Sequence, residues 1–128
     1  MKIMKNKIPD NRKKTGAWGE RMAAEYLEKR GVRILENNAR TPYGEIDLIG
    51  EDNNQLVFIE VKTLRNKRFG DPEVSVNSKK QGHMINSALH YLQDKNLLDS
   101  EWRIDVVTLC APPAKPIEFR WFKNAISE

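Results

Sequence analysis

The chain has 128 residues, of which 39% are hydrophobic and 31% are charged, with a formal net charge of +4. These values fit one soluble domain with a modest core, and they exclude a membrane span because no apolar run approaches the roughly 18 residues that a span requires. The first residues lack the apolar stretch of a signal peptide, so we expect a cytoplasmic protein without a membrane partner. Cys110 is the single cysteine of the sequence. It cannot form an internal disulfide, and we expect a small buried residue at a strand end in a reducing compartment.

Basic residues are concentrated at the amino terminus. Residues 1–14 carry six basic side chains against one acid, Asp10, which leaves 16 basic and 17 acidic side chains in the rest of the chain. We predict a flexible basic arm over residues 1–14 and a single domain over residues 15–128. Nucleic-acid affinity would have to come from this arm and from local basic clusters, because counterion release requires concentrated positive charge. The competing interpretation of the arm is a solubilising tail.

A first helix is predicted from about Gly16 to Lys29, ended by Gly31, with an apolar arc on one side. Glu20 lies at the margin of that arc, where it could face a site on the sheet or pair with a nearby arginine. Residues 32–38 are predicted to form a strand, followed by a polar link over residues 39–43. In this link Arg40 and Tyr43 could approach a phosphate and a base or sugar.

Residues 44–62 carry the strongest hairpin pattern of the chain, two apolar strands joined at Asn53 and Asn54. Asparagine tolerates the left-handed conformation that a tight hairpin turn requires. A turn centred there fixes the register of the strands. On one face it pairs Asp47 with Glu60 and Glu45 with Lys62, bordered by Ile49 opposite Phe58. On the other face it pairs Ile46 with Val61 and Leu48 with Ile59.

This register forces two carboxylates together, since directly opposed side chains have Cβ atoms about 4.5–5.5 Å apart. A divalent cation would relieve the repulsion between Asp47 and Glu60, and Mg²⁺ is typically held by one or two carboxylates plus phosphate oxygens. Lys62 lies two residues beyond Glu60 on the same face, so it would lie beside the metal. The competing interpretation is a solvated hairpin in which Glu45 and Lys62 form an ordinary ion pair.

The segment after Lys62 is rich in basic residues and is predicted to be a phosphate-contacting loop that includes Arg65, Lys67 and Arg68. A second helix is predicted from Ser78, as its cap, to about Asp94. Its periodicity places Lys80 and Gln81 on the inward side of the first turn. An inward lysine at a helix start calls for an anionic partner, either a phosphate or the acidic cluster, unless its side chain extends along the helix edge to water.

Two more strands are predicted, at residues 102–109 and 117–122. Asp105 is expected to bind a neighbouring arginine or backbone group in a structural role. The order of elements is therefore helix, three strands, helix, strand and a C-terminal strand. This order predicts an α/β sandwich with a central mixed sheet flanked by helices.

Six short motifs of the sequence belong together, namely Gly19-Glu20, residues 44–49, residues 58–63, Phe69-Gly70, Lys80-Gln81 and residues 103–107. These motifs resemble those of the YraN-like (UPF0102) family, a family placed among the PD-(D/E)XK nucleases and similar to archaeal Holliday junction resolvases. The resemblance extends from about Gly16 to Leu109 and implies a restriction-endonuclease-like fold. Two positions depart from the family pattern, Ile46 in place of a proline and Leu64 in place of an arginine.

The resemblance implies a Mg²⁺- or Mn²⁺-dependent endonuclease that acts on DNA, with branched DNA as one candidate substrate. Asp47, Glu60 and the Val61 carbonyl would hold the metal, and Lys62 would orient a water or stabilise phosphate charge. Glu20 is a candidate metal or water ligand, Lys80 a partner of the scissile phosphate and Gln81 a nucleic-acid contact. Two alternatives stay open, namely an inactive nucleic-acid-binding module on the same fold and a protein-interaction domain that uses its C-terminal strand. A resolvase would further require a homodimer.

Overall fold

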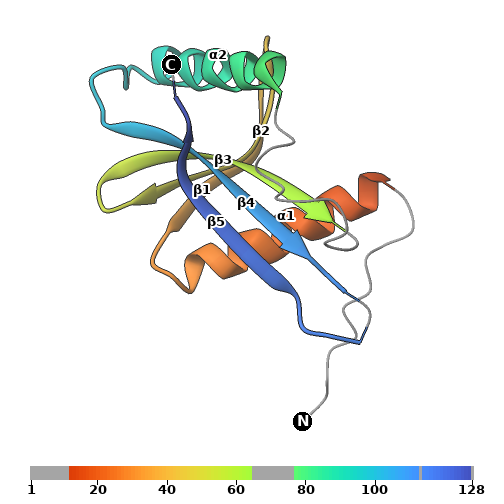
Figure 1. Cartoon of the computed structure of the whole chain (residues 1–128). Helices are drawn as coiled ribbons and strands as arrows, with labels where there is room; N and C mark the ends of the chain where they lie inside the picture. Colours follow the sequence, from red (N-terminus) through yellow and green to blue (C-terminus); the bar gives the residue numbers. More distant parts are fainter. Residues whose placement is uncertain (1–11, 65–76, 113, 128) are drawn as a thin grey trace.

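The computed structural model describes residues 12–64, 77–112 and 114–127. In this part of the chain two helices and five strands follow the predicted order, which confirms the predicted α/β class (Figure 1). The predicted basic loop with Arg65, Lys67 and Arg68, and residues 1–11 of the predicted arm, lie outside the described residues. The elements are α1 (Arg12–Glu28), β1 (Arg33–Thr41), β2 (Gly44–Asp52), β3 (Gln55–Leu64), α2 (Ser78–Asp94), β4 (Trp102–Cys110) and β5 (Glu118–Ile126).

The five strands form one mixed sheet in the order β1-β2-β3-β4-β5. Neighbouring strands are antiparallel except β3 and β4, which are parallel because α2 carries the chain back across the sheet. Strands β1 and β5 are the edges. Among the described residues, no helix is long and apolar enough to cross a membrane.

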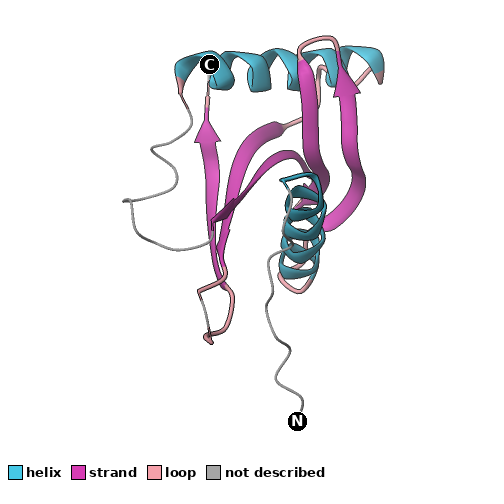
Figure 2. Ribbon diagram, turned by 90° about the vertical axis from the view of Figure 1, so that its right-hand side faces the viewer, coloured by secondary structure: helices cyan, strands magenta, loops and turns pink. Residues whose placement is uncertain are grey.

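The alternation of side chains along the strands divides the core between the two faces of the sheet. Leu48, Val57 and Ile59 pack with Ala23 and Leu27 of α1. Their strand neighbours pack with α2, as Ile49 and Phe58 do with Ala88 and Leu92. Figures 1 and 2 show α2 lying across the end of the sheet where β5 finishes, with α1 away from it. The predicted sandwich is therefore confirmed.

The helix ends differ slightly from the prediction. Helix α1 begins at Arg12, so residues 12–14 are helical instead of part of the arm, and the chain leaves the helix through Gly31, whose φ of 92° suits a glycine. Helix α2 is capped by Asn77, not by Ser78, because the Asn77 side chain accepts a hydrogen bond from the Lys80 backbone N–H at 2.9 Å.

The hairpin turn is confirmed, and the register near it is as predicted. Asn53 and Asn54 have positive φ angles of 49° and 65°, and the paired positions include Ile49 with Phe58 and Leu48 with Ile59. Beyond Leu48 the prediction is wrong, because the ladder between β2 and β3 ends there. The pairs predicted between residues 45–47 and 60–62 are absent from the described register.

Strand β2 instead continues its ladder with β1, where Glu45 pairs with Arg40 and Ile46 pairs with Ala39. Strand β1 reaches Thr41, so residues 39–41 belong to a strand and not to the predicted polar link. Ile46 packs in the core beneath α2, not beside Leu48 as strict alternation predicts. The sequence alternation fails at the point where β2 leaves β3 while it stays paired with β1.

Asp105 lies at the centre of a buried polar network on β4. Its carboxylate accepts hydrogen bonds from Arg103 Nε at 3.0 Å, from Trp121 Nε1 at 2.8 Å and from the Asn124 backbone N–H at 2.8 Å. Arg103 also donates to Asp52 at 2.7 Å, beside the hairpin turn. The network ties β5 and the hairpin turn to β4, so the predicted structural role of Asp105 is confirmed. Cys110, the last residue of β4, is buried as predicted.

Candidate metal centre

A gap opens at the point where β2 separates from β3, and the side chain of Asp47 lies in it. Asp47 Oδ2 accepts a hydrogen bond from the Val61 backbone N–H at 2.9 Å. The carboxylate thus takes the place of the backbone acceptor that a continuing β2 ladder would have supplied. Because the N–H and C=O of one strand residue point to the same side, the Val61 carbonyl points towards the same gap.

Glu60 contributes a second carboxylate to this region. It is 7% exposed, and its Oε1 lies 2.8 Å from Lys80 Nζ at the start of α2. Lys80 therefore has the anionic partner that its inward position called for. Asp47 and Glu60 also lie close enough for a side-chain hydrogen bond, although they are not ladder partners. The two acids meet as predicted, but through their side chains at the end of the hairpin ladder.

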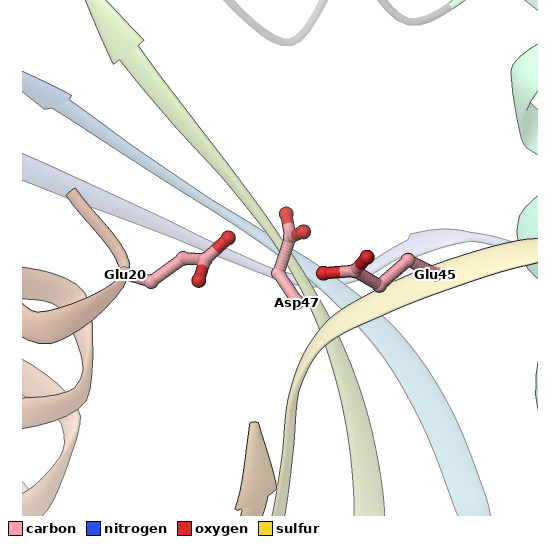
Figure 3. A group of neighbouring side chains, drawn as sticks. All are labelled: Glu20, Glu45 and Asp47. Carbon is pink, nitrogen blue, oxygen red and sulfur yellow. The ribbon is translucent and has the colours of Figure 1, made fainter. Parts of the chain in front are cut away.

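Glu20 and Glu45 complete the cluster. One carboxylate oxygen from each of Glu20, Glu45 and Asp47 can be chosen so that all three lie within 4.8 Å of one another. Figure 3 shows Glu20 from α1 and Glu45 from β2 reaching towards Asp47 from opposite sides. Glu20 was predicted as a ligand, whereas Glu45 was placed only in an ion pair with Lys62. Alternation puts Glu45 on the same face as Asp47, and the approach of α1 brings Glu20 close to both.

Two features bring Glu20 to the cluster. Gly19 packs against Thr63 of β3 so closely that a Cβ at position 19 would overlap with Thr63 Oγ1. Because position 19 has no side chain, α1 lies close to β3 at the residue next to Glu20. Asn38, in a left-handed conformation with a φ of 55°, forms a side-chain hydrogen bond with Glu20. The sequence did not single out Asn38, because the residue pattern of β1 does not indicate that Asn38 contacts a residue of α1.

The carboxyl groups are under electrostatic strain. Burial, followed by the repulsion from Glu60, raises the pKa of Asp47 to about 8, although the hydrogen bond from Val61 opposes the shift. Burial is also the main cause of a raised pKa at Glu20, where the bond from Asn38 lowers it and the charge of Glu45 raises it. Glu60 has the Lys80 ammonium as a partner. Among the described residues, burial and the neighbouring acids thus outweigh the groups that stabilise the ionised forms of Asp47 and Glu20.

Two lysines border the acids. Burial lowers the pKa of Lys62, the charge of Glu60 opposes that effect and the charge of Lys80 adds to it. The hydrogen bond to Glu60 raises the pKa of Lys80 despite its burial. Lys62 thus lies beside Glu60, as the spacing of Glu60 and Lys62 predicts, and both ammonium groups are near the end of the hairpin ladder.

The other residues predicted to bind nucleic acid are more dispersed. Arg40 is an exposed residue of β1 that pairs with Glu45 in the ladder. Tyr43 lies in the turn between β1 and β2 with 48% of its surface exposed. Gln81 is half-buried in the first turn of α2. Beside the cluster, a cavity of about 120 Å³ opens between α2 and the strands β2 and β3, with Tyr43, Glu45, Glu60 and Lys80 among its lining residues.

The fold and the cluster define an α/β protein with a group of carboxylates that could bind a metal ion. A model of the uncharacterised protein family UPF0102 matches residues 19–109, and the chain belongs to that family. The family predicted from the motifs at residues 44–49 and 58–63 is thereby confirmed.

Similar proteins come from several bacteria. A UPF0102 protein of Dehalococcoides mccartyi is 43% identical over 118 residues, which cover 92% of this chain and 97% of that protein. One from Syntrophomonas wolfei is 44% identical over 78% of this chain and 87% of that protein. Among solved structures, Pyrococcus furiosus SfsA in complex with Ca²⁺ is similar, with a TM-score of 0.40 and 15% identity over 88% of this chain. This chain spans 63% of the SfsA chain.

Proposed function

We propose that this protein is a divalent-metal-dependent endonuclease that cleaves phosphodiester bonds in DNA. The observation that carries the proposal is the closeness of the Asp47 and Glu60 carboxyl groups beside the Val61 backbone, whose N–H donates to Asp47, with the pKa of Asp47 raised to about 8. Buried carboxylates with shifted pKa values are concentrated at functional sites. The family motif at Asp47 and at Glu60 to Lys62 supports the same assignment.

The residues present fit a hard divalent cation. Carboxylate and carbonyl oxygens are the ligands that Mg²⁺ and Mn²⁺ prefer, and the cluster supplies both kinds. Burial and mutual repulsion disfavour the ionised acids in the protein alone, so a cation would relieve an electrostatic cost. Asp47, Glu60 and the Val61 carbonyl would hold the ion, and Glu20 and Glu45 would bind it directly or through water.

The remaining groups of the site have distinct parts in the proposed reaction. A bound divalent ion would lower the pKa of a water molecule and offset phosphate charge. Lys62, half-buried beside Glu60, would orient the attacking water or stabilise the charge that develops on the phosphate. Lys80 would contact the phosphate from the side of α2, where it now pairs with Glu60. Glu20, held by Asn38, would orient a water on the side of α1.

The test is a cleavage assay with the purified full chain on duplex, single-stranded and four-way-junction DNA in Mg²⁺, Mn²⁺ or EDTA. Cleavage is expected with either metal, and it should disappear in EDTA and in the Asp47→Asn variant. Glu25→Gln, which changes an exposed acid on the same helix as Glu20, is the matched control and should retain activity.

The other outcomes of this assay separate the alternatives. Binding of DNA without cleavage in any metal would favour a nucleic-acid-binding module on the same fold. Absence of both binding and cleavage would favour the protein-interaction interpretation. Preferential cleavage of the four-way junction, together with a dimer in sedimentation experiments, would support a resolvase-like activity.

A further inference from the structure

The cavity beneath α2 has a composition different from that of the carboxylate cluster beside it. Its volume is about 120 Å³, and its walls are largely apolar, with Ile46, Phe58 and Met84 among them. Ser87 contributes a hydroxyl group that is hydrogen-bonded to Thr41 at 2.9 Å. Pockets of this kind, apolar with a few placed polar groups, are typical of binding sites for small organic groups.

The size of the cavity restricts the group that it can hold. An engineered apolar cavity of about 150 Å³ in another protein accepts one benzene ring, whereas drug-sized ligands occupy roughly 300–1,000 Å³. A cavity of about 120 Å³ therefore suits one six-membered ring. A fused two-ring system would have to extend through the mouth of the cavity.

The mouth of the cavity indicates what the ring is attached to. Glu60, which carries the ion pair with Lys80, belongs both to the cavity lining and to the candidate metal centre. A phosphate contacted by Lys80 would therefore lie at the rim of the cavity. Tyr43 and His83 also line it and are exposed, and aromatic side chains in such positions stack on nucleobases.

We propose that this cavity receives an unpaired pyrimidine base from the nucleotide next to the phosphate at the carboxylate cluster. The inference rests on the proposed function for the position of the phosphate, and it deepens that function by naming the substrate. A base inside an intact duplex cannot enter a pocket in a protein unless it is extruded from the stack. The substrate is thus DNA with an unpaired nucleotide at the cleavage position, as at a single-stranded or branched segment.

Base-dependent binding can be measured separately from cleavage. Fluorescence anisotropy measures the affinity of the full chain for three single strands of twelve nucleotides each, which are abasic outside the central position. The measurement is made in EDTA, where no cleavage is expected. One strand carries no base, one carries a central thymine and one carries a central adenine. All three have the same phosphate charge, so any difference in affinity reports the base alone.

The thymine strand is expected to bind roughly tenfold more tightly than the abasic strand, the size of one stacking interaction, with the adenine strand in between. Tyr43→Ala and the cavity-filling variant Met84→Trp should reduce this difference. Asn86→Ala, an exposed position on the same helix outside the cavity, should retain it. Thermal melting of each variant shows whether it is folded. If Met84→Trp does not fold, Tyr43→Ala still decides the test, because Tyr43 is exposed and its loss should not unfold the protein.

Equal affinity for the thymine and abasic strands would overturn the proposal, as would a difference that Tyr43→Ala leaves unchanged. Tighter binding of adenine than of thymine would overturn the pyrimidine assignment. If the protein cleaves DNA yet shows no base dependence, the proposed function stands and this inference fails. If base-dependent binding occurs without cleavage in any metal, the inference stands and the nuclease activity fails.

Discussion

The backbone N–H of Val61 donates a hydrogen bond to Asp47 Oδ2 at 2.9 Å, at the point where β2 leaves β3. This single contact connects the fold to the candidate site. The hydrogen bond stabilises the ionised form of Asp47, but burial and the charge of Glu60 outweigh it and raise the pKa to about 8. Asp47 therefore accepts the hydrogen bond of a backbone N–H that the ladder leaves without a strand partner. Its ionised form is electrostatically unfavourable at this position, and a bound cation would stabilise it.

The first prediction concerns the pH dependence of stability in EDTA. Asp47 binds its proton more tightly in the folded protein than in the unfolded chain, where its pKa is near 3.8. Between about pH 4 and about pH 8 the unfolded chain therefore loses a proton that the folded protein keeps, and the free energy of unfolding falls as the pH rises. Above about pH 8 both states are ionised and this contribution is constant.

Asp47→Asn removes this contribution, so the comparison isolates it. Between about pH 6 and about pH 8 the free energy of unfolding of the wild type should fall relative to that of Asp47→Asn, by up to about 2–3 kcal/mol. Urea denaturation at several pH values measures the difference. Added Mn²⁺ should reduce the fall in the wild type, because the cation stabilises the ionised carboxylate. Parallel curves for the two proteins would mean that Asp47 is ionised normally.

The second prediction is that Mn²⁺ binding depends on the carboxylate cluster and not on acidic residues in general. Isothermal titration calorimetry should show clearly weaker Mn²⁺ binding by Asp47→Asn and Glu60→Gln than by the wild type. If Glu20 binds the ion through a water molecule, Glu20→Gln should bind Mn²⁺ with an intermediate affinity. Glu25→Gln should bind like the wild type, since Glu25 is exposed and is not one of the acids that lie together in the cluster. Equal affinities in all five proteins would rule out the metal centre.

The third prediction uses two glycines of α1 as a matched pair. Gly16→Ala meets no atom within 4 Å and should stabilise the helix by up to about 1 kcal/mol. Gly19→Ala should instead destabilise the protein by about 1–3 kcal/mol, since the new methyl group overlaps with Thr63 and pushes α1 away from β3. Because Glu20 moves with α1, Mn²⁺ affinity should also fall in Gly19→Ala.

Thr63→Ala tests whether the overlap is the cause. This substitution removes Thr63 Oγ1, the atom nearest to the new methyl group. The double variant Gly19→Ala/Thr63→Ala should therefore recover much of the melting temperature and of the Mn²⁺ affinity, each measured against Thr63→Ala alone. If Gly19→Ala binds Mn²⁺ like the wild type, the close approach of α1 is not what positions Glu20.

The hairpin shows how far sequence reasoning reaches at this site. The turn at Asn53 and Asn54, and the pair of Leu48 with Ile59, follow from local chemistry and from alternation, and both are predictable. The end of the ladder is not, because it depends on where β2, which stays paired with β1 on both sides of this point, separates from β3. That separation is a long-range property of the sheet, and the sequence pattern near Ile46 does not encode it.

The same distinction separates the site residues. The partner of Lys80 was predictable, since an inward lysine at a helix start requires an anion and the acids of the hairpin were the nearest candidates. Glu20 could be placed at the margin of an apolar arc and identified by the family motif. Asn38 could not, because its hydrogen bond with Glu20 forms only when α1 meets β1. Glu45 shares a face with Asp47 by alternation, but its closeness to Glu20 also depends on the approach of α1.

The fourth prediction concerns β5, an edge strand that could stabilise the monomer or bind a partner. Trp121 packs on the α1 side of the sheet, and its Nε1 donates to the buried Asp105. Trp121→Ala should therefore destabilise the monomer by about 3 kcal/mol in chemical denaturation. Trp121→Phe, which retains most of the apolar surface but loses the N–H, should cost about 1–2 kcal/mol. A fully stable Trp121→Ala monomer that has lost only an oligomer would identify β5 as an interface.

The fifth prediction separates the two lysines of the site. In the proposed reaction Lys62 acts on the water or the phosphate, so Lys62→Ala should lower the turnover number of DNA cleavage by about 100-fold or more while Mn²⁺ affinity changes little. Lys80 forms an ion pair with Glu60 at 2.8 Å. Lys80→Ala removes a positive charge that competes with a cation for the Glu60 carboxylate, so this variant should bind Mn²⁺ more tightly.

Single-turnover cleavage and calorimetry on the same preparations measure both quantities. Lys62→Arg retains the positive charge and should recover part of the rate if charge stabilisation is the role of Lys62, but little of it if the ammonium group must orient a water. Lys79→Ala, an exposed neighbour of Lys80 on α2, is the control for a general loss of positive charge and should resemble the wild type in both measurements. If Lys62→Ala lowers metal affinity and the turnover number in equal proportion, Lys62 positions the metal ligands and does not act on the water or the phosphate.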